Sequence, residues 1–75
     1  YKAINLSTIQ KLVDDKDLTK VTIADFIAAG FVNSNQLVKV LANGELTAKV
    51  EVEAHAFSEK AVAIITEKGG NAVKL

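Results

Sequence analysis

The run from Lys39 to Gly69 constrains the fold more than any other part of the chain. In order it contains a glycine turn at Asn43-Gly44, an alternating apolar and polar segment over Lys49–Ala54, and an apolar segment that follows Ser58. Alternation with period two is typical of a strand with one buried face, and a serine before an apolar run indicates a helix start. The run therefore predicts a turn, a strand and a helix in that order.

The N-terminal part predicts a strand over Ala3–Leu6 followed by a helix. Ser7 begins this helix, with Gln10 three residues later as its capping-box partner. The helix buries Ile9, Leu12 and Val13 and ends in a polar loop at residues 14–17. That acidic segment lacks the glycine and the distal glutamate of a calcium loop, so we interpret it as solvated.

A second helix is predicted to follow Thr22. Asp25 occupies its third position, where a carboxylate meets free amides, and Val21 and Phe26 have the spacing of a hydrophobic staple. Gly30 has the place of a left-handed residue after the helix. A polar loop of residues 33–36 comes next.

Val38–Leu41 is a further predicted strand, and its apolar residues can be aligned with those of the alternating segment in only some registers. A tight hairpin at Asn43-Gly44 would set Val40 against Thr47, an apolar residue against a polar one. Pairing Val40 with Val50 aligns the valines and needs a longer connection. We therefore expect residues 43–47 to form an exposed loop, if the two strands pair at all.

The C-terminal part predicts a helix capped by Ser58 and an edge strand over Ala72–Leu75. Phe57 and Val62 are spaced as a staple, and the buried side of the helix consists of Ala61, Val62, Ile64 and Ile65. Gly69-Gly70 ends the helix. Short strands alternate with short helices, so the predicted class is α/β, a small sheet of short strands with interspersed helices in one domain over residues 1–75.

Composition limits the possible functions. Nine lysines balance nine acidic residues, arginine is absent, and a basic excess of the kind that drives phosphate binding is missing. Charge alone thus argues against a strong autonomous nucleic-acid binder. The chain has no cysteine and no apolar stretch long enough to span a membrane. An intracellular protein without disulfides or thiolate metal sites is expected.

A catalytic role is not predicted. His55 and Ser58 lie three residues apart with Glu53 and Glu59 nearby, yet Ser58 is needed as a helix cap and no strained glycine elbow surrounds it. We expect the His55 ring to pack or to hydrogen-bond locally. One histidine and no cysteine leave no metal or cofactor site.

The central run resembles the C-terminal domain of the bacterial large-subunit ribosomal protein L-fifteen family. The elements that carry this resemblance are Lys39-Val40-Leu41-Ala42, Gly44-Glu45-Leu46-Thr47, Val50, Val52, Ala54-His55-Ala56-Phe57-Ser58, Ala61, Ile65 and Gly69. The N-terminal elements agree with it, so the resemblance covers essentially the whole chain.

The resemblance implies a non-enzymatic structural component of the large ribosomal subunit, located on cytoplasmic ribosomes. The implied partners are large-subunit ribosomal RNA and neighbouring ribosomal proteins, with no membrane and no small-molecule substrate. It also implies that the 75 residues are the C-terminal part of a longer protein whose basic, glycine-rich extension precedes them. The chain begins at Tyr1 without a methionine, which fits that expectation.

The candidate RNA-binding residues follow from the resemblance and from the positions at which this chain differs from the family pattern. Relatives often carry lysine where this chain has Glu53 and Glu59, and basic residues in the loop of residues 33–36, so that loop is not assigned to RNA. The remaining candidates are Lys39, Asn43, Gly44, Thr47, Lys49, His55 and Lys60. For each lysine a solvated surface charge is the alternative, and for the loop a turn chosen for backbone geometry alone.

A different functional class is a protein-interaction module without RNA. A neutral surface and an open terminal strand around Val73 could pair with the edge of another chain. Salt separates the two classes, because lysine–phosphate contacts weaken steeply with ionic strength and an apolar interface does not.

Overall fold

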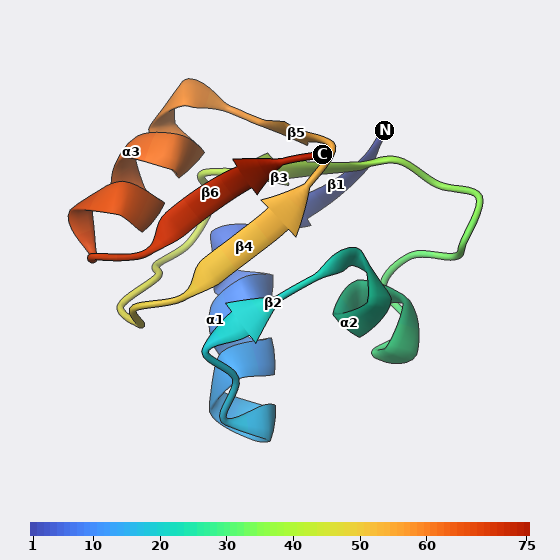
Figure 1. The fold of residues 1–75 in the computed structure, drawn as a ribbon, viewed down its shortest axis with the longest axis horizontal. Helices are drawn as coiled ribbons and strands as arrows, with labels where there is room; N and C mark the ends of the chain where they lie inside the picture. Colours follow the sequence, from blue (N-terminus) through green and yellow to red (C-terminus); the bar gives the residue numbers. More distant parts are fainter.

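The computed structural model describes residues 1–75 and contains six short strands and three helices. Figure 1 shows their arrangement. In chain order they are β1 (Lys2–Asn5), α1 (Leu6–Lys16), β2 (Lys20–Val21), α2 (Ile23–Ala28), β3 (Val38–Leu41), β4 (Glu51–Ala54), β5 (Ala56–Phe57), α3 (Glu59–Glu67) and β6 (Asn71–Lys74). The predicted α/β class is confirmed.

The strands form two parallel sheets in place of one small sheet. Sheet A has the order β1-β3-β5 and sheet B the order β2-β4-β6. In Figure 1 β4 and β6 lie in front of β3 and β1, and the chain passes from one sheet to the other between β4 and β5. Strands β3 and β4 belong to different sheets, so they do not pair and the conditional register of Val40 with Val50 does not form. Each strand meets its neighbours in parallel through a helix or a long crossover.

The core lies between the two sheets and is closed by the helices. Alternation buries Val38 and Val40 of β3 and also Val52 and Ala54 of β4, and all four join one cluster of fifteen apolar residues. Phe26 of α2 is fully buried in the same cluster. Since every strand is short, the facing apolar rows of two sheets supply the burial that a single sheet of this size would lack.

Helix α1 differs from its prediction at both ends. It begins at Leu6, and Asn5, the residue at the cap position, makes no side-chain cap hydrogen bond, so the predicted Ser7–Gln10 capping box is wrong. The helix continues to Lys16 and ends at Asp17, which has a left-handed backbone with φ 53°. The acidic residues at 14 and 15 are therefore helical, and no metal-binding cluster forms there.

Helix α2 confirms its predicted signals. The hydroxyl of Thr22 accepts from the Asp25 amide at 3.4 Å, and the Asp25 carboxylate accepts from the Thr22 amide at 2.8 Å. The staple residues Val21 and Phe26 are both fully buried. Gly30 has a positive φ of 82° just beyond the helix end, as predicted.

Helix α3 begins after Ser58, whose hydroxyl accepts from the Ala61 amide at 3.2 Å. Ala61 and Ile65 are fully buried, but Val62 is 39% exposed, so its predicted place on the buried side is wrong. The strand that follows, β6, lies at an edge of sheet B as predicted. The edge position follows from its single partner, β4.

Replacing Ser58 by alanine is expected to lower the free energy of unfolding by about 0.5–2 kcal/mol. The substitution removes the acceptor of the Ala61 amide at the start of α3. Urea denaturation followed by circular dichroism measures the change. Ser58→Asn, whose side chain can also cap, is the control and should retain most of the stability; an equal loss in both variants would contradict a capping role.

Candidate nucleic-acid interface

The loop that begins at Asn43 is held against the start of α1. The Ser7 amide donates to the Asn43 carbonyl at 3.1 Å, and the Asn43 side-chain amide donates to the Asn5 side-chain oxygen at 3.2 Å. Gly44 has φ 80°, and a Cβ added to it would overlap the Ser7 side chain. The loop therefore starts from a fixed geometry, and Asn43 keeps a second amide hydrogen and its oxygen for a ligand.

The far end of the same loop is held by Gln10. Its side-chain oxygen accepts from the Thr47 amide at 2.9 Å and from the Ala48 amide at 3.1 Å, and its side-chain nitrogen donates to Asp14 at 2.9 Å. Gln10 thus serves the loop and not the cap of α1. Because Leu46 between these contacts is buried, the expectation of an exposed loop over residues 43–47 is wrong for this residue. The Thr47 amide is also engaged and has no hydrogen left for a phosphate.

His55 lies at the corner where the chain leaves sheet B for sheet A. Its backbone amide donates to the Val38 carbonyl at 3.1 Å, and the Val38 amide donates to the ring Nδ1 at 2.9 Å. The ring therefore continues the hydrogen-bond ladder of β3 with a side-chain acceptor. Since Nδ1 accepts, the neutral ring carries its proton on Nε2, and the Nε2–H group is the donor left for a ligand. His55 forms a hydrogen bond as predicted, but the expectation of a local partner is wrong, because Val38 is 17 residues away in sequence.

Replacing His55 by alanine is expected to lower the free energy of unfolding by about 1–3 kcal/mol, because the Val38 amide loses its acceptor in a partly buried site. His55→Asn is the matched control, since the asparagine Oδ1 stands at the same distance along the side chain as the histidine Nδ1. Thermal unfolding compares the two variants. Similar losses for alanine and asparagine would show that the ring, and not the hydrogen bond, is what matters.

Lys39 occupies the middle strand of sheet A. In the parallel register Ala3 of β1 lies beside it on one side and Ala56 of β5 on the other. Its side chain points to the face opposite the buried Val38 and Val40, and the residue is half-buried. Lys39 thus has only methyl groups as its register partners.

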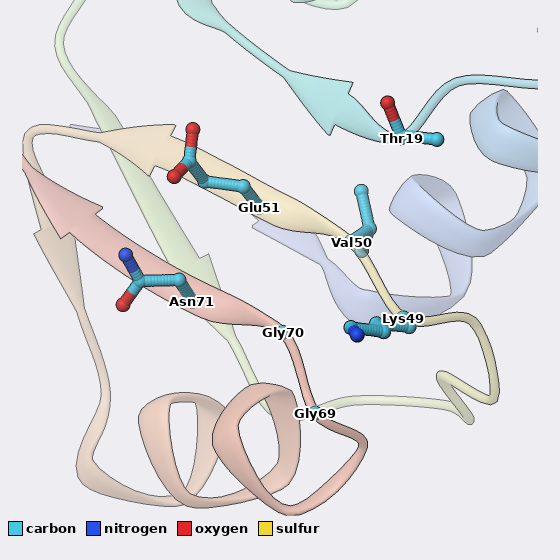
Figure 2. Close-up of a pocket in the computed structure, with 7 residues that line it drawn as sticks. All are labelled: Thr19, Lys49, Val50, Glu51, Gly69, Gly70 and Asn71. Atoms are coloured by element: carbon cyan, nitrogen blue, oxygen red, sulfur yellow. The ribbon is translucent and has the colours of Figure 1, made fainter.

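Lys49 and Lys60 belong to other elements than Lys39. Lys49 precedes β4 and lies beside the Gly69-Gly70 turn, at a cavity of about 410 Å³ that Figure 2 shows. The Gly69 and Gly70 amides donate to carbonyls of α3, so they are not free for an anion. Lys60 is exposed near the start of α3. The predicted residues therefore come from several different elements of the fold.

The acidic residues of β4 are paired. Lys20 of β2 contacts the Glu51 carboxylate at 3.3 Å and the Glu53 carboxylate at 3.1 Å, and these are the two ion pairs of the structure. Hydrogen bonds and charge from Glu53, and then Glu51, raise the pKa of Lys20 above its ordinary value. Glu53 thus serves a contact within sheet B. The outward face of that sheet offers no free cation at this position.

The Lys20 contacts predict a specific titration. A raised pKa means that their contribution to stability is complete below the ordinary lysine pKa and is lost as the pH rises through the raised value. Glu53→Gln should move the Lys20 pKa back toward its ordinary value, because Glu53 is the largest cause of the shift. Side-chain NMR of the lysines above pH 9 measures this. Glu59→Gln, on the exposed start of α3, is the control and should leave Lys20 unchanged.

The arrangement supports binding and gives no support to catalysis. The Ser58 hydroxyl is occupied as a helix cap and the His55 Nδ1 by the Val38 amide, so neither group is placed to activate the other. No helix of the structure has the length and apolar character needed to cross a membrane. The predicted residues fall in three candidate regions: the outward face of sheet A with the loop beside it, the surroundings of Lys49, and the start of α3.

Comparison with known proteins identifies similar chains. The sequence model of a family that comprises ribosomal proteins 50S-L15 and 50S-L18e and their 60S counterpart matches residues 3–73. Proteins called "Large ribosomal subunit protein uL15" are 69% identical in Phocaeicola vulgatus, 68% in Bacteroides fragilis and 56% in Parabacteroides distasonis. Each match covers the whole chain and 51% of the relative. The chain therefore spans about half the length of these relatives.

Proposed function

Because this chain belongs to the family of ribosomal proteins 50S-L15 and 50S-L18e and their 60S counterpart, we propose that it is a structural constituent of the large ribosomal subunit. It binds large-subunit ribosomal RNA and supports assembly of the subunit. The observation that carries the proposal is the match over residues 3–73 to a family of ribosomal proteins. No observation on the fold favours an RNA-free interaction module over this role.

The proposal extends to setting and partners. The chain forms one domain, corresponds to the C-terminal part of a longer ribosomal protein, and works on cytoplasmic ribosomes beside other large-subunit proteins. Support comes from the relatives, which are about twice as long and carry the name of a large-subunit protein. The single apolar cluster shared by both sheets fits one folding unit.

Within this role the candidate residues divide by chemistry. Lys39, Lys49 and Lys60 supply ammonium groups for phosphates, and His55 supplies its Nε2–H group. Asn43 contributes the free part of its side-chain amide. Gly44 and Thr47 act by holding the loop in shape, because one lacks a side chain and the amide of the other is engaged by Gln10.

Binding to purified ribosomal RNA tests the proposal. We expect the chain to bind protein-free large-subunit ribosomal RNA more tightly than small-subunit ribosomal RNA. The logarithm of the binding constant should fall linearly with the logarithm of the salt concentration. Three lysine–phosphate contacts would give a slope of about −2 to −3. Binding without preference for the large-subunit RNA, or binding that is insensitive to salt, would contradict the proposed role.

A further inference from the structure

The outward face of sheet A carries side chains that do not enter the core. Alternation places one set of side chains on this face, opposite the buried valines of β3, and we call this set the platform: Ala3, Asn5, Lys39, Leu41 and Ala56. Ala3 is exposed and the other four are half-buried. Neighbouring strands are about 4.8 Å apart, so the alanine methyls beside Lys39 form a shallow row over which its longer side chain rises.

The charges of the two sheets are segregated. Strands β1, β3 and β5 contain two lysines and no acidic residue, whereas β4 of sheet B contributes Glu51 and Glu53 to its outward face. Both ion pairs of the structure start from Lys20, so no carboxylate pairs with the Lys39 ammonium. In a chain with zero formal charge, sheet A is therefore an acid-free surface with an unpaired cation at its centre.

The residues next to the platform are also amides and exposed apolar side chains. Asn5 is linked to Asn43 by the side-chain hydrogen bond at 3.2 Å, which joins the platform to the loop held by α1. Before the strands begin, Tyr1 is 75% exposed and Leu37 is 50% exposed. The surface thus combines a single cation with amides, an aromatic ring and small apolar groups. The strands themselves carry no acidic side chain, and the exposed Glu45 lies in the adjoining loop.

We propose that the platform is the surface of this chain on which RNA docks, with a phosphate at the Lys39 ammonium. The inference rests on the proposed function and assigns RNA to one of the three possible regions. Alanines beside Lys39 let a backbone of ribose and phosphate approach closely, and double-helical RNA presents a wide, shallow minor groove with its 2′-hydroxyls. The outward face of sheet B is less suited to RNA, because its carboxylates repel phosphate and the Lys20 ammonium is already paired with them.

Lysine acetylation of the unaltered chain tests the assignment without any substitution. Protein-free large-subunit ribosomal RNA is the probe, and mass spectrometry follows all nine lysines in its presence and absence. We expect Lys39 to lose most of its reactivity on binding, while Lys11 on the exposed side of α1 is unchanged. If RNA binds and protects Lys49 or Lys60 but not Lys39, the assignment of RNA to the platform is overturned and the proposed function stands. Absence of binding overturns the proposed function together with it.

Two substitutions then test how the charge on the platform affects RNA binding, each with a control variant elsewhere on the surface. Lys39→Ala should weaken RNA binding and make the salt slope shallower by about one, and Lys11→Ala is its matched control. Ala3→Glu keeps Lys39 but adds a carboxylate beside it on the edge strand, and it should weaken binding at least as much. Ala24→Glu, exposed on α2, is the control for that charge. Unchanged slopes for Lys39→Ala and full binding by Ala3→Glu would overturn the proposal.

The same measurement distinguishes RNA from an acidic protein segment. Polyglutamate is added at a carboxylate concentration that equals the phosphate concentration of the RNA. RNA should protect Lys39 more than polyglutamate does, because the minor groove of double-helical RNA is shallow and presents 2′-hydroxyls that can lie over the alanine row, and polyglutamate has neither. Equal protection by both polymers would overturn the assignment to RNA.

Discussion

Gly44→Ala is expected to lower the free energy of unfolding by about 2–5 kcal/mol. Two costs combine at this position. A left-handed backbone with φ 80° costs an alanine about 1–2 kcal/mol. The added methyl also overlaps the Ser7 side chain in the first turn of α1, and such overpacking costs about 1–3 kcal/mol. Urea unfolding followed by circular dichroism measures the sum.

Gly30 provides the matched control for Gly44. It has almost the same positive φ, 82°, but a Cβ added to it would meet nothing within 4 Å. Gly30→Ala should therefore show the backbone cost alone. In a Ser7→Gly background the cost of Gly44→Ala should fall most of the way to that of Gly30→Ala, because the opposing Cβ and hydroxyl are gone and only the Cα at 3.2 Å remains. Equal losses at the two glycines in the unaltered background would rule out the contact with α1.

Gly70→Ala is the second substitution with a large expected effect, a loss of about 3 kcal/mol at the upper end of the overpacking range. A Cβ on Gly70 would overlap the carbonyl oxygen of Val50 and crowd that of Ile65. Both are backbone atoms, so no side-chain rotation relieves the contact. The Val50 carbonyl also accepts from the Asn71 amide at 3.3 Å, and β6 would have to move away from β4. Loss of amide-exchange protection in β6 should accompany the loss of stability.

The neighbouring Gly69 separates close approach from backbone conformation. Its φ is 83°, and a Cβ there would lie in ordinary contact with Lys49 side-chain carbons at 3.6–3.7 Å. Gly69→Ala should therefore cost only the backbone term of about 1–2 kcal/mol and should leave exchange in β6 intact. A larger loss at Gly69 than at Gly70 would contradict the close approach of the α3–β6 turn to β4.

These pairs of glycines show where sequence patterns stop. Gly69-Gly70 is read correctly as a helix end, since glycine after an apolar run is a local signal. Nothing local distinguishes the two residues, because one is required by its own φ and the other by a strand twenty residues away. The predicted capping box of Ser7 and Gln10 is wrong for the same reason. The two residues have the right spacing, yet the Ser7 side chain lies against Gly44 and the Gln10 side chain accepts from the amides at 47 and 48.

In the candidate site, too, the sequence predicts the residue types but not their neighbours in space. The family resemblance and the list of lysines come from residue types alone. That Lys39 lies between two alanines depends on the register of three strands that are up to 53 residues apart, from Ala3 to Ala56. Likewise, the partner of Glu53 is Lys20, which no sequence spacing indicates.

Local signals predict four elements from the chain alone: the capped helices after Thr22 and Ser58, the strand at Val38–Leu41, and the alternating segment before His55. Caps and period-two alternation act within a few residues, so they are readable in one dimension. Three other features depend on the folded chain. The strands divide between two parallel sheets, the Lys39–Gly69 run contributes to both sheets, and the His55 ring binds the Val38 amide. Parallel pairing connects residues across long crossovers, and its register is set by packing of the two apolar faces.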